Sequence, residues 1–225
     1  MKKTRVLLAD DHKIVLEGLR SLLEPEFEIV GAVEDGRALV AEAKRLSPEV
    51  VVADISMPGL NGIDAAKQIR KIDAHIKIVF LTMHADVSYA VSAFEAGASG
   101  FVLKHSAPQE LITALREAVQ GRTYVTPMIA GDLIGSYQKG SLQQGELKAA
   151  LSPRQREVLQ LLAEGKSTKE AAAVLNISPR TAEFHKYRMM EQLKIKTSAE
   201  LIQYALKHGL VSLQFPPSKF SLKTS

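Results

Sequence analysis

Apolar and polar positions follow two different patterns along the chain. Over the first 120 residues, short apolar runs typical of buried strands alternate with the three- and four-residue spacing of amphipathic helices. The predicted strands are Arg5–Ala9, Ile29–Val33, Val50–Ala53, Ile76–Leu81 and Gly100–Leu103. The predicted helices are His12–Glu24, Arg37–Leu46, Ile63–Ile72, Asp86–Ala96 and Pro108–Gln120. This alternation favours an α/β fold, a doubly wound five-stranded parallel sheet with helices on both faces.

The alternation stops after Gly121, and the rest of the chain follows helical patterns. Residues 122–150 hold one weak helical pattern, Met128–Tyr137, before a stretch rich in Gly, Ser and Gln that is typical of a linker. Residues 151–211 predict a small all-α domain of four short helices. We therefore expect four parts, namely an α/β domain (1–121), a linker (122–150), a helical domain (151–211) and a tail (212–225).

Helix-capping residues mark the predicted helices of the second domain. Ser152-Pro153-Arg154-Gln155 and Ser167-Thr168-Lys169-Glu170 each place a Ser at the N-cap and Gln or Glu three residues later. Ser178-Pro179 opens a third helix that extends to about Leu193, and a fourth spans Ser198–Lys207. Two helices joined by a tight turn inside such a unit indicate a helix-turn-helix.

Charge and composition narrow the class of protein. Residues 1–120 carry 14 basic and 17 acidic side chains, whereas residues 151–211 carry 10 and 6. The basic second domain is therefore the better candidate for contact with nucleic acid. The chain has no cysteine, which excludes disulfides and thiolate metal sites. No window has the ~20 apolar residues of a membrane span, so we expect a cytoplasmic protein without a membrane partner.

Polar residues follow four of the predicted strands, where parallel strands share one edge of the sheet. They are Asp10, Asp11, Asp54, Thr82 and Lys104. Three converging carboxylates repel one another, and a hard divalent cation with oxygen ligands, Mg²⁺, relieves that repulsion. A hydroxyl and an ammonium opposite the metal suit a small tetrahedral anion, so this set favours formation of an aspartyl phosphate.

The motifs LLADDH, VVVADISMPGLNG, FLTMHAD and GASGFVLK resemble the receiver domain of two-component response regulators of the NarL/FixJ family. The resemblance implies that Asp54 accepts a phosphoryl group from a sensor histidine kinase. It implies that Asp10, Asp11, Asp54 and the backbone carbonyl of Ser56 hold Mg²⁺. It also implies that Thr82 and Lys104 contact the phosphoryl group, and that Phe101 turns inward when Thr82 moves. For His12 and His84 we predict no metal role.

The segment from Leu151 to Val211 resembles the LuxR-type effector domain of the same family. The predicted recognition helix is Pro179–Leu193, whose inward face holds Ala182, His185, Met189 and Leu193. The predicted DNA contacts are Arg180, Thr181, Glu183, Phe184, Lys186, Tyr187 and Arg188. The helix begins Thr-Ala-Glu where the family commonly has Thr-Val-Lys. By resemblance, the last helix supplies dimerisation candidates, namely Leu201, Ile202 and Ala205, although some of its apolar residues must serve the intramolecular core.

These features favour a phosphorylation-controlled transcription factor over two alternatives. Phosphatases and ATPases with an aspartyl-phosphate intermediate carry a second carboxylate two residues after the nucleophile, where this chain has Ser56, so we predict that it is not an enzyme. A transcription factor that ignores phosphorylation is the other alternative. The resemblance implies that the unphosphorylated receiver covers the recognition helix, and that the active form binds double-stranded DNA as a homodimer on half-sites about 10 bp apart.

Overall fold

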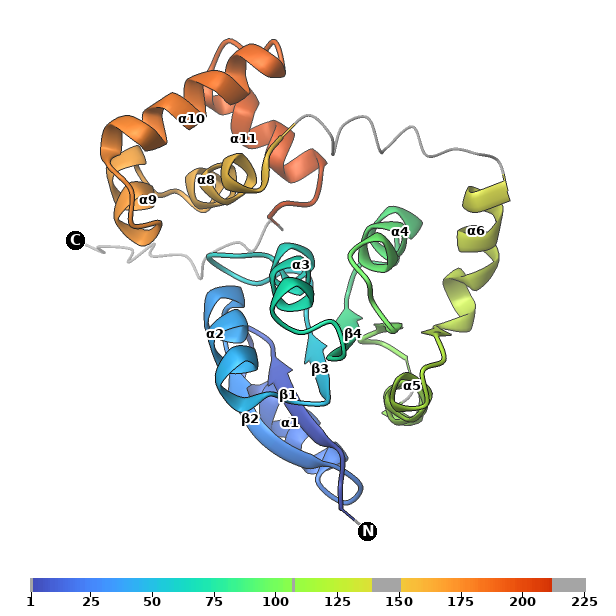
Figure 1. The fold of residues 1–225 in the computed structure, drawn as a ribbon. Coiled ribbons are helices and arrows are strands. Elements are labelled where there is room, and N and C mark those ends of the chain that lie inside the picture. The colour runs from blue at the N-terminus through green and yellow to red at the C-terminus, as the bar shows by residue number, and fades with distance from the viewer. Residues whose placement is uncertain (1, 107, 139–150, 212–225) are drawn as a thin grey trace, which may run out of the picture.

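The computed structural model describes residues 2–106, 108–138 and 151–211, which form an α/β unit followed by a helical unit (Figure 1). The strands are β1 (Arg5–Ala9), β2 (Glu28–Val33), β3 (Val50–Ala53), β4 (Lys77–Thr82), β5 (Gly100–Leu103) and β6 (Tyr124–Val125). The helices of the first unit are α1 (Lys13–Leu23), α2 (Gly36–Leu46), α3 (Gly62–Ile72), α4 (Val87–Glu95), α5 (Pro108–Val119) and α6 (Pro127–Gln138). Those of the second are α8 (Pro153–Ala163), α9 (Thr168–Val174), α10 (Pro179–Gln192) and α11 (Ser198–Lys207).

The strands form one parallel sheet in the order β2-β1-β3-β4-β5-β6. The first five strands follow the flavodoxin-like order, which confirms the predicted doubly wound class. The order turns back between β1 and β3, so the carboxyl ends of these strands lie beside the crevice where ligands gather in such sheets. The sheet has a sixth strand beyond the five that were predicted.

Helices cover both faces of the sheet, and successive strand residues point to opposite faces. On one face, Leu7, Val51 and Phe80 pack with α2, α3, α4 and α6 in a single buried cluster. On the other face, Leu8 and Val52 pack with α1 and α5. Because both faces are covered, β3 is buried along its whole length, as its unbroken apolar run predicts.

The segment that was assigned to the linker contributes to the α/β unit. The short strand β6 pairs with β5 in parallel, and α6 follows directly after it. The side chains of Ile129 and Leu133 on α6 are buried in the same cluster as α4. The first unit therefore extends beyond residue 121 and includes α6.

The helical unit has its own core, formed by residues of α8, α9, α10 and α11. Ser152 and Ser167 cap α8 and α9 with complete capping boxes, and Ser178 caps α10, as their sequences predict. Within the part of the chain that the structure describes, no helix combines the length and apolarity needed to cross a bilayer.

The two units contact each other through α8, which lies against the receiver-side helices α2 and α3. Arg156 of α8 forms an ion pair with Asp64 of α3, with nitrogen–oxygen distances of 3.0–3.1 Å. Glu157 accepts hydrogen bonds from Arg37 of α2 (3.4 Å) and Gln68 of α3 (3.1 Å). We call this α8–α2/α3 contact the docking interface.

Candidate functional site

Parallel pairing brings the predicted polar residues to one edge of the sheet. Ala9 and Ala53 are paired at the ends of β1 and β3, so Asp10 and Asp54 follow side by side. Thr82 ends β4 and pairs with Leu103, after which comes Lys104. The backbone N–H of Asp54 donates to the carbonyl of Ala9 at 2.9 Å, and that of Lys104 donates to Thr82 at 2.8 Å. These hydrogen bonds continue the sheet by one residue and fix the directions of both side chains.

The ammonium of Lys104 joins two of the carboxylates. Its Nζ lies 2.5 Å from Oδ2 of Asp10 and 2.6 Å from Oδ2 of Asp54, and both aspartates are buried. Burial by itself lowers the pKa of Lys104, but the charge of Asp54 and hydrogen bonds to both aspartates outweigh burial and raise the pKa. Lys104 is therefore a full positive charge at neutral pH, held next to the oxygens of Asp54.

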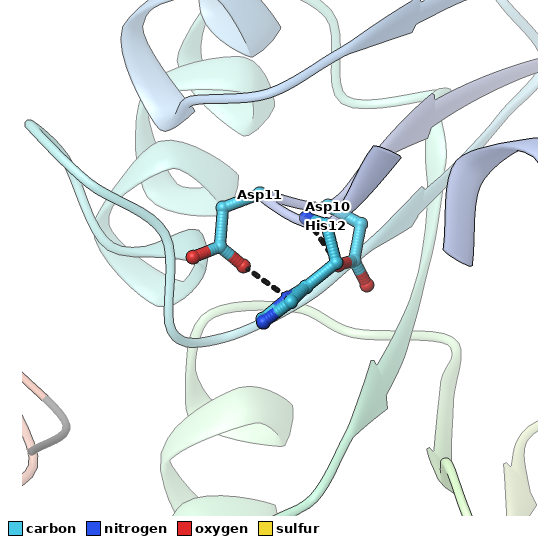
Figure 2. Close-up of side chains that lie close together, drawn as sticks. All are labelled: Asp10, Asp11 and His12. Atoms are coloured by element: carbon cyan, nitrogen blue, oxygen red, sulfur yellow. Dashed lines mark hydrogen bonds and ion pairs between the residues drawn. The ribbon is translucent and has the colours of Figure 1, made fainter. Parts of the chain in front are cut away.

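Asp11 and His12 complete the acidic side of the site (Figure 2). The Nδ1 atom of His12 lies 2.8 Å from Oδ1 of Asp11 and 3.2 Å from Oδ1 of Asp10. Potential ligand atoms of these three residues lie within 4.8 Å of one another. Carboxylate oxygens are the ligands that hard divalent cations prefer, so the donor set fits Mg²⁺. His12 was expected near this edge without a metal role, and the structure places its ring beside both carboxylates.

His84 also belongs to this edge, near which the sequence placed it without a metal role. Its Nε2 lies 2.6 Å from the hydroxyl of Ser56, and its backbone N–H donates to Oγ1 of Thr82 at 3.2 Å. The imidazole stacks on Tyr89, with ring centroids 4.1 Å apart and planes 9° apart. Burial is the main cause of a lowered pKa at His84, which favours the neutral ring at pH 7.

Two further residues of the predicted switch are fully enclosed. Thr82 and Phe101 both have 0% exposure, and Phe101 packs in the cluster between the sheet and α4. The ring is therefore already inward in this structure. Ser56 donates its backbone N–H to Oδ1 of Asp54 at 3.2 Å, so the chain turns back toward the carboxylate directly after β3.

The recognition helix predicted at Pro179–Leu193 corresponds to α10. Ala182 and Met189 are buried, as expected for the inward face, and His185 and Leu193 are partly buried. The predicted DNA contacts are exposed or, for Lys186, partly exposed: Arg180, Thr181, Glu183, Phe184, Lys186, Tyr187 and Arg188. Phe184 and Tyr187 are 59% and 66% exposed, although both are large aromatic residues.

The expectation that the receiver covers the recognition helix is wrong for this structure. The receiver contacts α8 instead, and Figure 1 shows α10 on the outer side of the helical unit. The physical reason is polar pairing, since α8 carries the Arg156 and Glu157 side chains that pair with α3 and α2. The N-terminal face of α10 is therefore open while the two units are in contact.

Two of the three dimerisation candidates lie in the intramolecular core, the alternative that the sequence left open for some residues of this helix. Leu201 (1% exposed) and Ala205 (0%) belong to the core that α11 forms with α8, so neither presents a surface to a second chain. Ile202 is partly exposed. A single-sequence helical pattern does not distinguish an intramolecular apolar face from an intermolecular one, because both have the same spacing.

Comparisons with known proteins identify both units. Residues 6–116 match the family described as "Response regulator receiver domain", and residues 149–205 match "Bacterial regulatory proteins, luxR family". The transcriptional regulatory protein MctR of Rhizobium johnstonii is 36% identical over 212 residues, which cover 93% of this chain and 96% of that protein. Response regulator UvrY of Escherichia coli is 33% identical, covering 93% and 96%.

A solved structure of RcsB from Salmonella enterica serovar Typhimurium, bound to promoter DNA in the presence of the phosphomimetic BeF₃⁻, is also similar. It has 31% sequence identity and a TM-score of 0.59, and the match covers 90% of this chain and 98% of that one. The likeness therefore extends over both units.

Proposed function

The chain belongs to the two-component response regulators in which a receiver domain precedes a LuxR-type DNA-binding domain, and from that premise we propose the roles of its residues. This family consists of transcription regulators and not of enzymes. In our proposal, Asp54 accepts a phosphoryl group from a sensor histidine kinase. The position of the Lys104 ammonium, within 2.6 Å of both Asp10 and Asp54, carries this proposal.

Asp54 suits the role of nucleophile because its neighbours prepare it for an incoming anion. One oxygen, Oδ1, accepts the Ser56 N–H, and Oδ2 faces Lys104. A phosphoryl group on Asp54 adds negative charge, which Lys104 neutralises without moving far. The hydroxyl of Thr82, at the end of the neighbouring strand, donates to a phosphoryl oxygen and thereby reports the modification to β4, which pairs with β5 at Phe101.

Asp10, Asp11, Asp54 and the backbone carbonyl of Ser56 would hold Mg²⁺ in this proposal. Their oxygens form the hard donor set that Mg²⁺ requires. When bound, Mg²⁺ neutralises charge on the phosphoryl oxygens during transfer. Lys104 pairs with Asp10 as well as Asp54, so it offsets part of the repulsion among the carboxylates.

The output of the protein is the outer face of α10. Its exposed Arg180 and Arg188 and its partly exposed Lys186 suit phosphate contacts, while Glu183 and Phe184 suit base edges in the major groove. We propose that two copies bind a two-fold DNA site, with Ile202 of α11 as the remaining pairing candidate and with half-sites about 10 bp apart. We place the protein in the cytoplasm, because it can reach both of its proposed partners, the sensor kinase and the DNA, in that compartment.

Labelling tests the phosphoacceptor directly. Incubation of the protein with Mg²⁺ and a radiolabelled small phosphodonor such as acetyl phosphate should incorporate label that is lost in alkali. Asp54→Asn keeps the size of the side chain but lacks the nucleophile, so it should incorporate none. Asp73→Asn is a matched control, because Asp73 follows α3 at the other edge of the sheet, and it should label like the wild type. Full labelling of Asp54→Asn would assign the phosphate to another residue.

A further inference from the structure

Helix α8 of the effector domain contacts the loop that follows the phosphoacceptor. This loop, Ile55–Asn61, connects β3 to α3 and is called here the phosphoacceptor loop. Three of its backbone polar groups bond to α8 side chains: the carbonyl of Met57 and the N–H groups of Gly59 and Asn61. The partners lie about one hundred residues further along the chain, so the sequence pattern gave no sign of the contact.

Gln160 makes two of these hydrogen bonds and is 1% exposed. Its Oε1 accepts the Asn61 N–H at 2.8 Å, and its Nε2 donates to the Met57 carbonyl at 3.0 Å. Nε2 also donates to Oε1 of Glu164 at 2.8 Å. Both ends of the carboxamide are therefore engaged, which fixes its orientation between the two domains.

Glu164, the C-cap residue of α8 one turn after Gln160, makes the third hydrogen bond. Its Oε1 accepts the N–H of Gly59 at 2.8 Å. Gly59 adopts a left-handed conformation, φ +73°, that favours glycine, and this turn directs its N–H toward the effector. Gln160 and Glu164 together are called here the α8 clamp.

The phosphoacceptor loop is tightly joined to Asp54. A Cβ atom at Gly62 would lie 2.1 Å from the backbone oxygen of Asp54, so α3 begins in direct contact with the phosphoacceptor's own peptide. The Gly62 N–H also donates to the carbonyl of Ile55 at 2.8 Å. A movement of the loop therefore changes the surroundings of Asp54 and of the Ser56 carbonyl.

We propose that Gln160 is a positioning residue for phosphorylation, through which the docked effector holds the phosphoacceptor loop in the geometry of the unphosphorylated state. The inference rests on the proposed function, in which phosphorylation of Asp54 controls DNA binding, and it adds that phosphorylation weakens docking. Coupling between two equilibria is reciprocal. The α8 clamp therefore disfavours phosphorylation by the same factor by which phosphorylation weakens docking. Phosphorylation and the clamp then compete for the loop, and the signal reaches α8 without passing through Phe101.

Tyr89 provides a second route that the test must separate. It stacks on His84 in the phosphorylation site, and a Cβ atom at Gly209, just after α11, would lie 2.2 Å from the Tyr89 hydroxyl. A signal through α4 would move Tyr89 and leave the α8 clamp closed. The two routes therefore differ in what happens to the amide of Asn61.

Hydrogen exchange of the Asn61 and Gly59 amides in the full-length protein distinguishes them. In the wild type, saturating Mg²⁺ and BeF₃⁻ should speed exchange of the Asn61 amide by about tenfold or more, because its acceptor is released. Gln160→Ala should show fast exchange without BeF₃⁻ and little further change. It should also bind BeF₃⁻ about tenfold more tightly, equivalent to about 1.4 kcal/mol.

Two more variants keep the test decisive. Gln160→Glu keeps the size of the side chain but turns a donor into a carboxylate beside the Met57 carbonyl and Glu164, so it should exceed Gln160→Ala in both effects. Gln203→Ala, on the exposed side of α11, should match the wild type. Circular dichroism of all variants reports whether α8 stays folded. If one Gln160 variant loses helix, the comparison uses the other Gln160 variant.

The outcomes separate this inference from the proposed function. If BeF₃⁻ raises DNA affinity while exchange of the Asn61 amide stays slow, the inference is overturned and the route through Tyr89 stands. An unchanged BeF₃⁻ affinity in both Gln160 variants would overturn it as well. If BeF₃⁻ binds and leaves DNA affinity unchanged, the proposed function itself fails.

Discussion

At the scale of the residue, the site depends on charge balance at one edge of a parallel sheet. Strands β1 and β3 end with carboxylates and β5 with an ammonium, and Lys104 compensates two of the buried negative charges. Each of these residues alone is common at the end of a strand. Their meeting follows from parallel pairing, which is why their positions could be predicted from sequence.

Lys104→Met should slow phosphorylation of Asp54 at least tenfold, because it removes the positive charge that faces the developing negative charge. The initial rate of label incorporation at fixed Mg²⁺ and phosphodonor measures this. Lys77→Met is the control, since Lys77 begins β4 at the opposite edge of the sheet, and its rate should equal that of the wild type. A wild-type rate for Lys104→Met would remove Lys104 from the proposed mechanism.

At the scale of the element, apolar periodicity and capping predicted the helices and strands within one or two residues, as for β3 and α11. The two-residue strand β6 has no periodicity to detect, and it was missed together with the attachment of α6 to the receiver. Which surface covers an apolar helix face was harder to predict than the helix itself, as Leu201 and Ala205 show. Contacts between distant segments, such as Gln160 with Asn61, leave no local pattern at all.

The attachment of α6 to the receiver can be measured as stability. Leu133→Ala should lower the free energy of unfolding of the receiver by about 2 kcal/mol or more, because it leaves a cavity beside α4. The neighbouring residue Ile134 is 58% exposed, so Ile134→Ala should change the free energy of unfolding by less than about 0.5 kcal/mol. Urea unfolding of both variants tests the claim, and equal effects would place α6 outside the receiver core.

Phosphate contacts on α10 should be visible in the dependence of DNA affinity on salt. Lys186→Ala should weaken binding to all sequences and reduce the slope of log affinity against log salt by about 1. Lys71→Ala removes the same charge from the exposed end of α3 and serves as control. If both variants have the same slope, Lys186 does not contact a phosphate.

At the scale of the whole molecule, the described structure combines a docked effector with an open recognition helix. Docking rests on the Arg156–Asp64 ion pair, the Glu157 contacts and the α8 clamp. In the proposed function, control through α8 then acts on how two copies of the effector are arranged, because α10 itself is already accessible. This differs from an arrangement in which the receiver blocks the DNA-binding face.

The Asp64–Arg156 pair gives docking a dependence on pH. Burial raises the pKa of Asp64, but the hydrogen bonds and charge of Arg156, with the charge of Lys67, lower it below the usual value. The pair therefore stabilises docking fully above about pH 3.9, the ordinary Asp pKa, and its contribution is lost as pH falls through the lowered folded pKa.

Arg156→Met should raise the pKa of Asp64, measured by NMR of its carboxyl carbon, because the lowering partner is gone. The same variant should bind operator DNA more tightly than the wild type without phosphorylation at pH 7. Arg20→Met on α1, whose partner Glu24 is exposed, is the control for loss of a guanidinium. An unchanged pKa of Asp64 would mean that the ion pair does not form in solution.

The central claim is that the state of Asp54 controls DNA binding. The most direct measurement is the affinity of full-length protein for a genomic fragment selected by its own binding, at fixed salt, with and without Mg²⁺ and BeF₃⁻. The wild type should bind at least about fivefold more tightly with BeF₃⁻, a typical allosteric coupling, whereas Asp54→Asn should show no difference. Equal affinity of the wild type in both conditions would contradict the account.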